Sequence, residues 1–97
     1  MPTAQELVKK LDLSPHPEGG YYKRTFQNEK GPEGRGHATA IYYLLEGGHF
    51  NKWHRVGADE LWFWHAGASL TLEVDFKQQG VQSLTLGPNV IAGERPQ

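Results

Sequence analysis

The stretch that decides the fold runs from residue 48 to residue 67 and reads GHFNKWHRVGADELWFWHAG. Aromatic and apolar residues separated by single polar ones predict two short strands here, Phe50–Arg55 and Glu60–His65. The segment Val56–Asp59 carries a glycine and predicts the turn between them. This stretch therefore favours β structure at the centre of the chain.

The same stretch holds the residues best suited to chemistry. Side chains alternate between the two faces of a strand, so Glu60, Trp62 and Trp64 are expected on one face. The preceding strand carries His54 near its end. An imidazole, a carboxylate and two indoles on the concave side of a small barrel would form a pocket for a small organic ligand.

Strands are also predicted on the C-terminal side of this stretch. In Leu70–Phe76, apolar residues alternate with threonine and acidic residues, which is typical of a half-buried strand. Leu84 and Leu86 continue the alternation in a further strand, and Asn89–Ala92 could add a short one. The polar segment between the first two predicts a turn.

Toward the N-terminus, two more strands and one helix are expected. Thr39–Leu45 and Tyr21–Gln27 are rich in aromatic and β-branched residues and predict strands. Thr3–Leu11 has a helical spacing of apolar residues, and Thr3 followed by Glu6 forms a capping-box pattern. Six or seven short strands with no helical crossover predict an all-β fold with one N-terminal helix. We expect residues 1–97 to form a single domain.

Composition excludes several classes of protein. The 97 residues carry a net charge of −1 and no cysteine, so neither disulfides nor thiolate metal ligands are available. No basic stripe suggests a nucleic-acid partner, and no apolar run has the length of a membrane span. We expect a cytoplasmic protein that acts on neither nucleic acid nor membranes.

The spacing in residues 48–67 resembles the first motif of the cupin superfamily. Gly48, His54, Glu60 and Gly67 fall on this motif, while Val56 stands where its second histidine would be. Metal-binding cupins take two histidines and one glutamate from this motif and a further histidine from a second motif. The resemblance therefore implies at most two metal ligands here, His54 and Glu60. We expect no tightly bound cofactor, with a divalent metal as the alternative.

Three further segments are similar to a small cupin subfamily long described as a domain of unknown function. They read PHPEGGYY at residues 15–22, TAIYYLL at 39–45 and WHRVGADE at 53–60. The resemblance covers nearly the whole chain and implies an RmlC-like jelly-roll barrel. In that subfamily, a segment similar to Gly93–Gln97 opens the second motif. The chain therefore resembles a cupin barrel without its last strands.

Each candidate residue has a structural alternative. His54 and Glu60 are the predicted catalytic pair. The tryptophans at 53, 62 and 64 are expected mainly to fill the core, and they can contact a ligand as well. The predicted ligand-binding residues are Trp62, Trp64, Tyr22, Arg24 and Tyr43. The alternation does not decide which faces of the strands at 21–24 and 41–44 point to a pocket. His16 and Glu18 lie in a turn fixed by proline and glycine, and we expect them to face solvent.

Three functions remain open from the sequence. The first is a small-molecule-binding cupin with metal-independent acid–base chemistry, such as isomerisation or epimerisation of a sugar-like or organic acid ligand. The second is a metal-dependent oxygenase or lyase, and the third is a non-catalytic binding or assembly module. Because Leu61 and Phe63 should face outward and one sheet edge should lack a partner, we also expect a homodimer, with strand exchange as one route.

Overall fold

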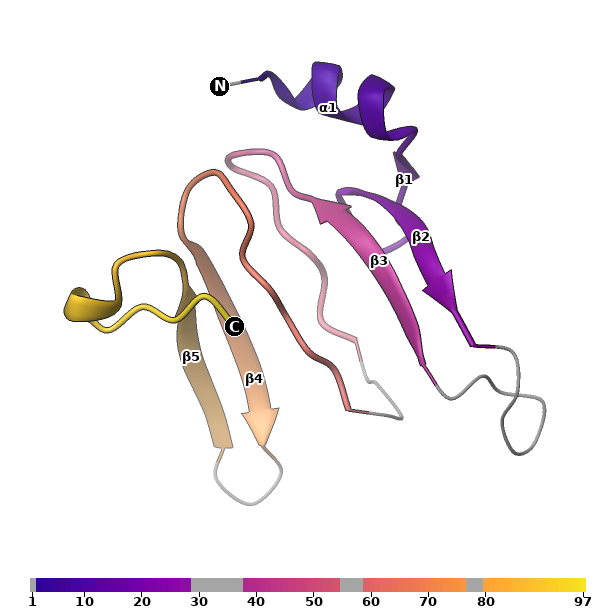
Figure 1. Cartoon of the computed structure of the whole chain (residues 1–97). Helices are drawn as coiled ribbons and strands as arrows, with labels where there is room; N and C mark the ends of the chain where they lie inside the picture. The colour runs from indigo at the N-terminus through magenta and orange to yellow at the C-terminus, as the bar shows by residue number, and fades with distance from the viewer. Residues whose placement is uncertain (1, 29–37, 55–58, 77–79) are drawn as a thin grey trace. The chain divides into compact units, whose positions relative to one another are not determined.

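The computed structural model describes residues 2–28, 38–54, 59–76 and 80–97. The chain divides into two compact units, Met1–Arg55 and Val56–Gln97 (Figure 1). The first unit contains the helix and a three-stranded sheet, and the second contains a hairpin followed by a C-terminal segment.

The N-terminal helix α1, Ala4–Leu11, forms where the capping pattern predicted it. The Thr3 hydroxyl accepts a hydrogen bond from the Glu6 N–H at 3.2 Å, and the Glu6 carboxylate accepts one from the Thr3 N–H at 3.1 Å. These two bonds satisfy amide groups that the helix itself leaves without a partner. The helix ends at Asp12, which adopts a left-handed conformation with φ 57°.

Three antiparallel strands follow the helix in the order β1-β2-β3. Their bounds are Ser14–Pro15 for β1, Tyr21–Gln27 for β2 and Thr39–Leu44 for β3. Strand β1 pairs only with the first two residues of β2, whereas β2 and β3 pair along their length. The two longer strands confirm the sequence prediction.

A bulge in β2 changes which side chains share a face. Tyr22 lies opposite Tyr43 and Arg24 opposite Ile41, so these residues are on one face of the sheet. The register then shifts between Arg24 and Phe26, and Phe26 pairs with Ala40 instead. Phe26 therefore moves to the opposite face, which strict alternation would not give it.

In the second unit, β4 (Leu70–Phe76) and β5 (Gly80–Leu86) form an antiparallel hairpin with an unbroken register from Leu70↔Leu86 to Phe76↔Gly80 (Figure 1). In β4 the apolar side chains at 70, 72 and 74 are half-buried, while the polar ones at 71, 73 and 75 are exposed. This alternation in β4 is the pattern predicted from the sequence. In β5 the side chains are exposed on both faces, except for Leu86, which is buried.

A C-terminal segment folds back onto the end of β5. Arg95 forms a parallel bridge with Leu86, and the Gly87 N–H donates to the Arg95 carbonyl at 2.8 Å. The Glu94 carboxylate accepts from the Ser69 hydroxyl at 2.7 Å and from the Asn89 N–H at 3.1 Å. Glu94 thus ties together the segments on either side of the hairpin.

Three strand predictions were wrong in the described residues. Residues 50–54 and 60–65 are irregular rather than strands, and Val90–Ala92 is a 3₁₀ helix, η2. The Lys52 N–H bonds to Glu18 O in a turn, and the Trp64 N–H bonds to Pro96 O in the C-terminal segment. These partners do not continue as strands, so no ladder forms. The Asn89 side chain caps η2 by accepting from the Ala92 N–H.

Apolar burial is uneven. Among the described residues, the buried hydrophobic side chains are Leu13, between α1 and β1, and Leu86, at the end of β5. Trp53, which we expected in the core, is 63% exposed. Leu61 and Phe63 are exposed, as their predicted outward orientation requires.

The described part of the chain is β-rich with a single short α-helix, which confirms the predicted fold class. Five strands are present in these ranges rather than six or seven. None of the helices that the structure describes is long and apolar enough to cross a membrane. The sequence also predicts a loop at Asn28–Gly36, and this loop and the turn at Val56–Asp59 lie largely outside the described residues.

Candidate functional site

His54 lies near the end of the first unit, in the irregular segment that follows β3. Its ring Nδ1 is 2.9 Å from the Lys52 carbonyl oxygen. A carbonyl oxygen can only accept a hydrogen bond, so Nδ1 carries the proton in this contact. In the neutral ring, Nε2 is then unprotonated and able to accept a proton or a hydrogen bond, or to bind a metal.

Glu60 and Trp62 interact in the second unit. The Trp62 indole Nε1–H donates to a Glu60 carboxylate oxygen at 2.8 Å, which places both side chains on the same side of the chain. This is the arrangement that the alternation predicted, although the segment is not a strand. The indole holds one carboxylate oxygen and leaves the other with its capacity to accept hydrogen bonds.

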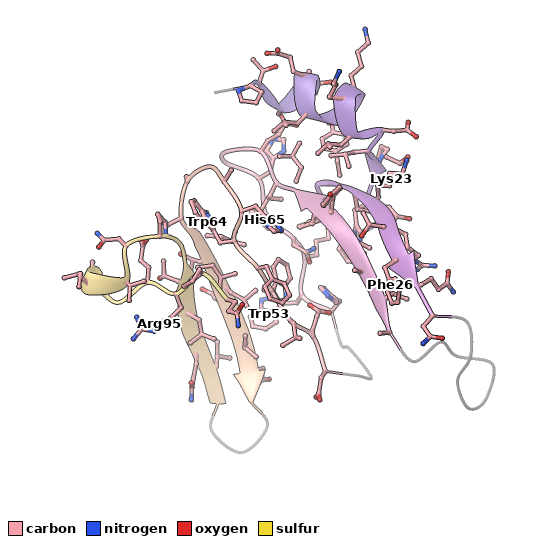
Figure 2. The ribbon with its side chains drawn as sticks, in the orientation of Figure 1. Lys23, Phe26, Trp53, Trp64, His65 and Arg95 are labelled. Atoms are coloured by element: carbon pink, nitrogen blue, oxygen red, sulfur yellow. The ribbon has the colours of Figure 1, made fainter. Side chains whose placement is uncertain are left out.

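Trp64 is half-buried and bonded on both its backbone and its side chain. Its N–H donates to the Pro96 carbonyl at 2.7 Å, and its indole Nε1–H donates to the Ala68 carbonyl at 3.1 Å. Figure 2 labels Trp64 in the segment before β4. Because the indole N–H is used internally, Trp64 would offer a ligand its apolar ring rather than its N–H.

Tyr22, Arg24 and Tyr43 are brought together on one face of the sheet by the pairing of β2 with β3. The pairing shows that these three residues share a face, and their role in binding a ligand stays a prediction. Tyr22 and Arg24 also line a surface depression of about 350 Å³, together with Asp12, Ser14 and Lys23. Figure 2 shows Lys23 projecting from β2, where its amine is 3.2 Å from the Asp12 carboxylate.

His16 was wrongly expected to face solvent. Its ring is half-buried and packs edge-on against Tyr22, with ring centroids 4.9 Å apart, and against Tyr43, at 5.4 Å. Glu18 is also half-buried, and its carboxylate lies 3.0 Å from His16 Nδ1. The Glu18 N–H is 3.1 Å from the same nitrogen, so the neutral ring can accept from the amide and the protonated ring can donate to the carboxylate.

Tyr43 is the centre of this cluster. Its hydroxyl donates to the Gly19 carbonyl and accepts from the Asn51 side-chain amide at 2.8 Å. Burial raises the pKa of Tyr43, the Asn51 hydrogen bond opposes that rise, and the negative charge of Glu18 adds to it. Tyr43 is therefore held as a neutral phenol. Sequence reasoning missed the roles of Asn51 and His16, because their contacts depend on how the turn at residues 16–20 and the segment after β3 fold back onto Tyr43.

The candidate residues thus divide between the two units. His54, Tyr22, Arg24 and Tyr43 belong to the first, while Glu60, Trp62 and Trp64 belong to the second. Within the ranges that the structure describes, no three histidine or acidic side chains gather into a group that could hold a metal ion. The described residues therefore supply no full set of metal ligands.

Comparisons with known proteins agree with this fold. A family model described as Cupin superfamily (DUF985) matches residues 5–97. A crystal structure of a protein from Shewanella oneidensis is 37% identical with a TM-score of 0.90, covering 99% of this chain and 61% of that one. A hypothetical protein from Leishmania major is 33% identical with a TM-score of 0.85, covering 98% of this chain and 62% of that one.

The chain therefore spans about three-fifths of the length of these two solved structures. No match was found among curated proteins. The family match extends over nearly all of the chain and includes the segments that carry His16, Tyr43, His54 and Glu60. This protein belongs to the cupin superfamily, in the family described as DUF985.

Proposed function

We propose that this cupin binds a small hydroxyl-bearing organic molecule, sugar-like or a hydroxy acid, and acts on it by metal-independent proton transfer of the isomerase or epimerase type. Glu60 and His54 are the proton-handling groups in this proposal. Trp62 and Trp64 provide the apolar surface for the ligand, and Tyr22, Arg24 and Tyr43 are further binding residues. Residues 1–97 would act as one domain.

The observation that carries the proposal is the 2.8 Å hydrogen bond between the Trp62 indole and the Glu60 carboxylate. It sets a fixed acceptor beside an aromatic ring. A ligand with both a hydroxyl group and an apolar C–H face matches this pair, because the hydroxyl can donate to the carboxylate while the C–H face rests on the indole. A carboxylate held in this way can also accept a proton from a bound ligand.

The state of His54 supports the acid–base part. Its Nδ1 is committed to the Lys52 carbonyl at 2.9 Å, which leaves Nε2 as the basic atom of the neutral ring. An imidazole fixed in one tautomer loses less freedom when it takes up a proton from a ligand at a defined position.

Ligand binding can be tested by titrating the purified protein with a panel of monosaccharides and hydroxy acids while following tryptophan fluorescence. A ligand that contacts Trp62 should change the emission. Glu60→Gln should weaken binding of that ligand by about tenfold or more, because a charged acceptor is lost. Glu73→Gln, an exposed carboxylate on β4 in the same unit, is the matched control and should bind normally. Equal weakening by both variants would refute the assignment of Glu60.

The reaction itself is tested in deuterated water. Any compound that binds should incorporate deuterium at the carbon that loses and regains a proton, and NMR detects this exchange directly. His54→Gln and Glu60→Gln should each slow the exchange by about 10²-fold or more. Binding without exchange in the unaltered protein would leave a binding function and contradict the proposed catalysis.

A metal-dependent enzyme remains the second candidate, because one observation favours it. Donation of the Nδ1 proton to a backbone carbonyl is the usual support for a histidine that binds a metal through Nε2. Elemental analysis of protein purified without added metal separates the two candidates. One equivalent of iron, manganese, nickel or zinc per chain that is lost in His54→Gln would favour this candidate over the first.

Self-assembly is the third candidate. Strand β1 pairs with β2 only at Tyr21 and Tyr22, so the outer edge of β2 from Lys23 to Gln27 has no strand partner among the described residues. Such an edge can pair with the same edge of a second copy. A symmetric homodimer, by edge pairing or strand exchange, would give twice the chain mass in light scattering, and a monomer at high concentration would contradict it.

We also propose that this protein acts in the cytoplasm, which cell fractionation tests.

A further inference from the structure

Lys52 connects the candidate base to the rest of the first unit. Its carbonyl accepts the His54 Nδ1 proton at 2.9 Å, so the position of this carbonyl determines the tautomer and the direction of the ring. On its other side, the Lys52 N–H donates to the Glu18 carbonyl at 2.8 Å. Lys52 is therefore anchored to the turn at residues 16–20, which is more than thirty positions earlier in the sequence.

That turn is held in place by Tyr43 and Asn51. The Tyr43 hydroxyl donates to the Gly19 carbonyl, next to the Glu18 carbonyl that anchors Lys52. The same hydroxyl accepts from Asn51 Nδ2 at 2.8 Å, and Asn51 directly precedes Lys52. One phenol thus fixes both ends of the Glu18–Lys52 hydrogen bond.

The backbone fit is close at this point. A side chain added at Gly19 would place its Cβ 2.7 Å from the Phe50 carbonyl oxygen, and one at Gly20 would lie 2.8 Å from the Tyr43 hydroxyl. The His16 ring covers Tyr43 edge-on at a centroid distance of 5.4 Å. The turn therefore contacts the segment that leads to His54 directly, with no room for a side chain between them.

We infer that Tyr43 and Asn51 are positioning residues for His54. Through the Gly19 carbonyl and the Glu18–Lys52 hydrogen bond, they hold the Lys52 carbonyl where it retains the proton on Nδ1 and presents Nε2 as the basic atom. The purpose of this arrangement rests on the proposed function, which gives His54 a proton to handle. The arrangement itself acts in the protein without a ligand.

The tautomer of His54 tests the inference in the full chain without any ligand. Long-range ¹H–¹⁵N spectra of protein labelled at histidine distinguish a proton on Nδ1 from one on Nε2, and His54→Gln identifies the signals of His54. The unaltered protein should show the Nδ1–H form. Tyr43→Phe should raise the ratio of Nε2–H to Nδ1–H by about 2- to 10-fold, the effect expected for one neutral hydrogen bond.

Tyr42→Phe is the matched control, because Tyr42 lies next to Tyr43 on the opposite face of β3 and is 46% exposed. It should leave the tautomer unchanged. Asn51→Ala provides a second test that keeps the Tyr43–Gly19 bond, and it decides the matter if Tyr43→Phe does not fold. A folded Tyr43→Phe or Asn51→Ala protein with an unaltered tautomer ratio would overturn the inference, as would an Nε2–H form in the unaltered protein.

The result is independent of the ligand screen. A tautomer that responds to Tyr43→Phe while no compound binds would support the positioning role and count against the proposed function. If a compound binds and exchanges a proton while the His54 tautomer does not respond to Tyr43→Phe, the result would support the proposed function and contradict the positioning role.

Discussion

The two irregular segments that carry the candidate catalytic pair are held in opposite ways. His54 bonds to Lys52, two residues away, but Lys52 is itself held by Glu18 and by the turn that Tyr43 supports, which are contacts between segments far apart in the sequence. Glu60 is fixed by Trp62, two residues away. The first arrangement fails if any distant partner moves, whereas the second persists as long as its own segment keeps its conformation.

This difference has a consequence for stability and for function. A contact between distant segments forms only after the chain has ordered both of them, so it is lost when the unit unfolds. A contact between neighbours requires little ordering. Substitutions in the turn at residues 16–20 should therefore affect stability and His54 together, while Glu60 and Trp62 should respond mainly to changes in their own side chains.

The largest effect is expected from Gly20→Ala. Gly20 has φ +76°, and an added Cβ would lie 2.6 Å from the Leu44 carbonyl oxygen. The left-handed conformation costs about 1–2 kcal/mol for alanine, and the clash should bring the loss of stability to about 2–4 kcal/mol. Urea unfolding measures this loss.

Gly48→Ala is the matched control for that substitution. Gly48 has nearly the same φ, +80°, but no atom lies within 4 Å of its added Cβ. Only the conformational cost of about 1–2 kcal/mol should remain. Equal losses of stability in the two variants would show that the turn is not packed closely against β3. The turn at residues 16–20 would then not depend on contacts with distant segments.

The next effect concerns the second unit. Glu94→Ala removes the acceptor for the Ser69 hydroxyl and the Asn89 N–H, and it should lower the free energy of unfolding by about 1–3 kcal/mol. The Trp62 indole N–H signal in NMR spectra should keep its position, because the Glu60–Trp62 bond is local. Glu73→Ala, on the exposed face of β4, should change stability by less than about 0.5 kcal/mol.

A shifted Trp62 indole signal in Glu94→Ala would contradict the local character of the Glu60–Trp62 contact. It would show that Glu60 depends on the C-terminal segment as His54 depends on its turn.

Alkaline pH should destabilise the first unit through Tyr43. Burial raises its pKa above the ordinary value of 10.0, so the folded protein holds this proton more tightly than the unfolded chain. The resulting stabilisation is complete below pH 10 and is lost as the pH rises through the folded-state pKa. Tyr43→Phe should remove this part of the pH dependence in urea unfolding, and Tyr42→Phe should retain it. Identical profiles for both would refute the assignment.

The smallest effect is expected at the helix cap, which is the most local contact of all. The hydrogen bond from the Thr3 N–H lowers the pKa of Glu6 below its ordinary value of 4.5. A lowered pKa gives stabilisation that is present above pH 4.5 and is lost as the pH falls through the folded-state value. Helix content by circular dichroism should therefore fall slightly in acid, and Glu6→Gln, which removes the titrating carboxyl, should remove this dependence. An unchanged acid transition in Glu6→Gln would contradict it.

Much of the fold could be read from local patterns. The capping box at Thr3 and Glu6 and the alternation in Leu70–Phe76 depend on neighbours in the sequence, and both are present in the structure. The cupin spacing of Gly48, His54, Glu60 and Gly67 identified the superfamily, which the family match confirms. The shared side of Glu60 and Trp62 also followed from alternation alone. The roles of these residues in a site stay predictions.

Other features could not be read in this way. Residues 50–54 have the composition of a strand, but their backbone bonds to a turn. The conformation of this segment therefore depends on its hydrogen-bond partner and not only on its own sequence. The bulge that moves Phe26 to the other face depends on the register with β3. His16 has the sequence context of a solvated turn, yet it packs against two tyrosines.

The sequence by itself thus determined the helix, the four strands β2, β3, β4 and β5, the superfamily and the residue types available for chemistry. Only the tertiary structure decided that Tyr22, Arg24 and Tyr43 share a face, and that Tyr43 and Asn51 support the backbone beside His54. The physical reason is the range of the interactions. Propensity, alternation and capping act within a few residues, whereas pairing and hydrogen bonding between distant segments depend on the three-dimensional path of the chain.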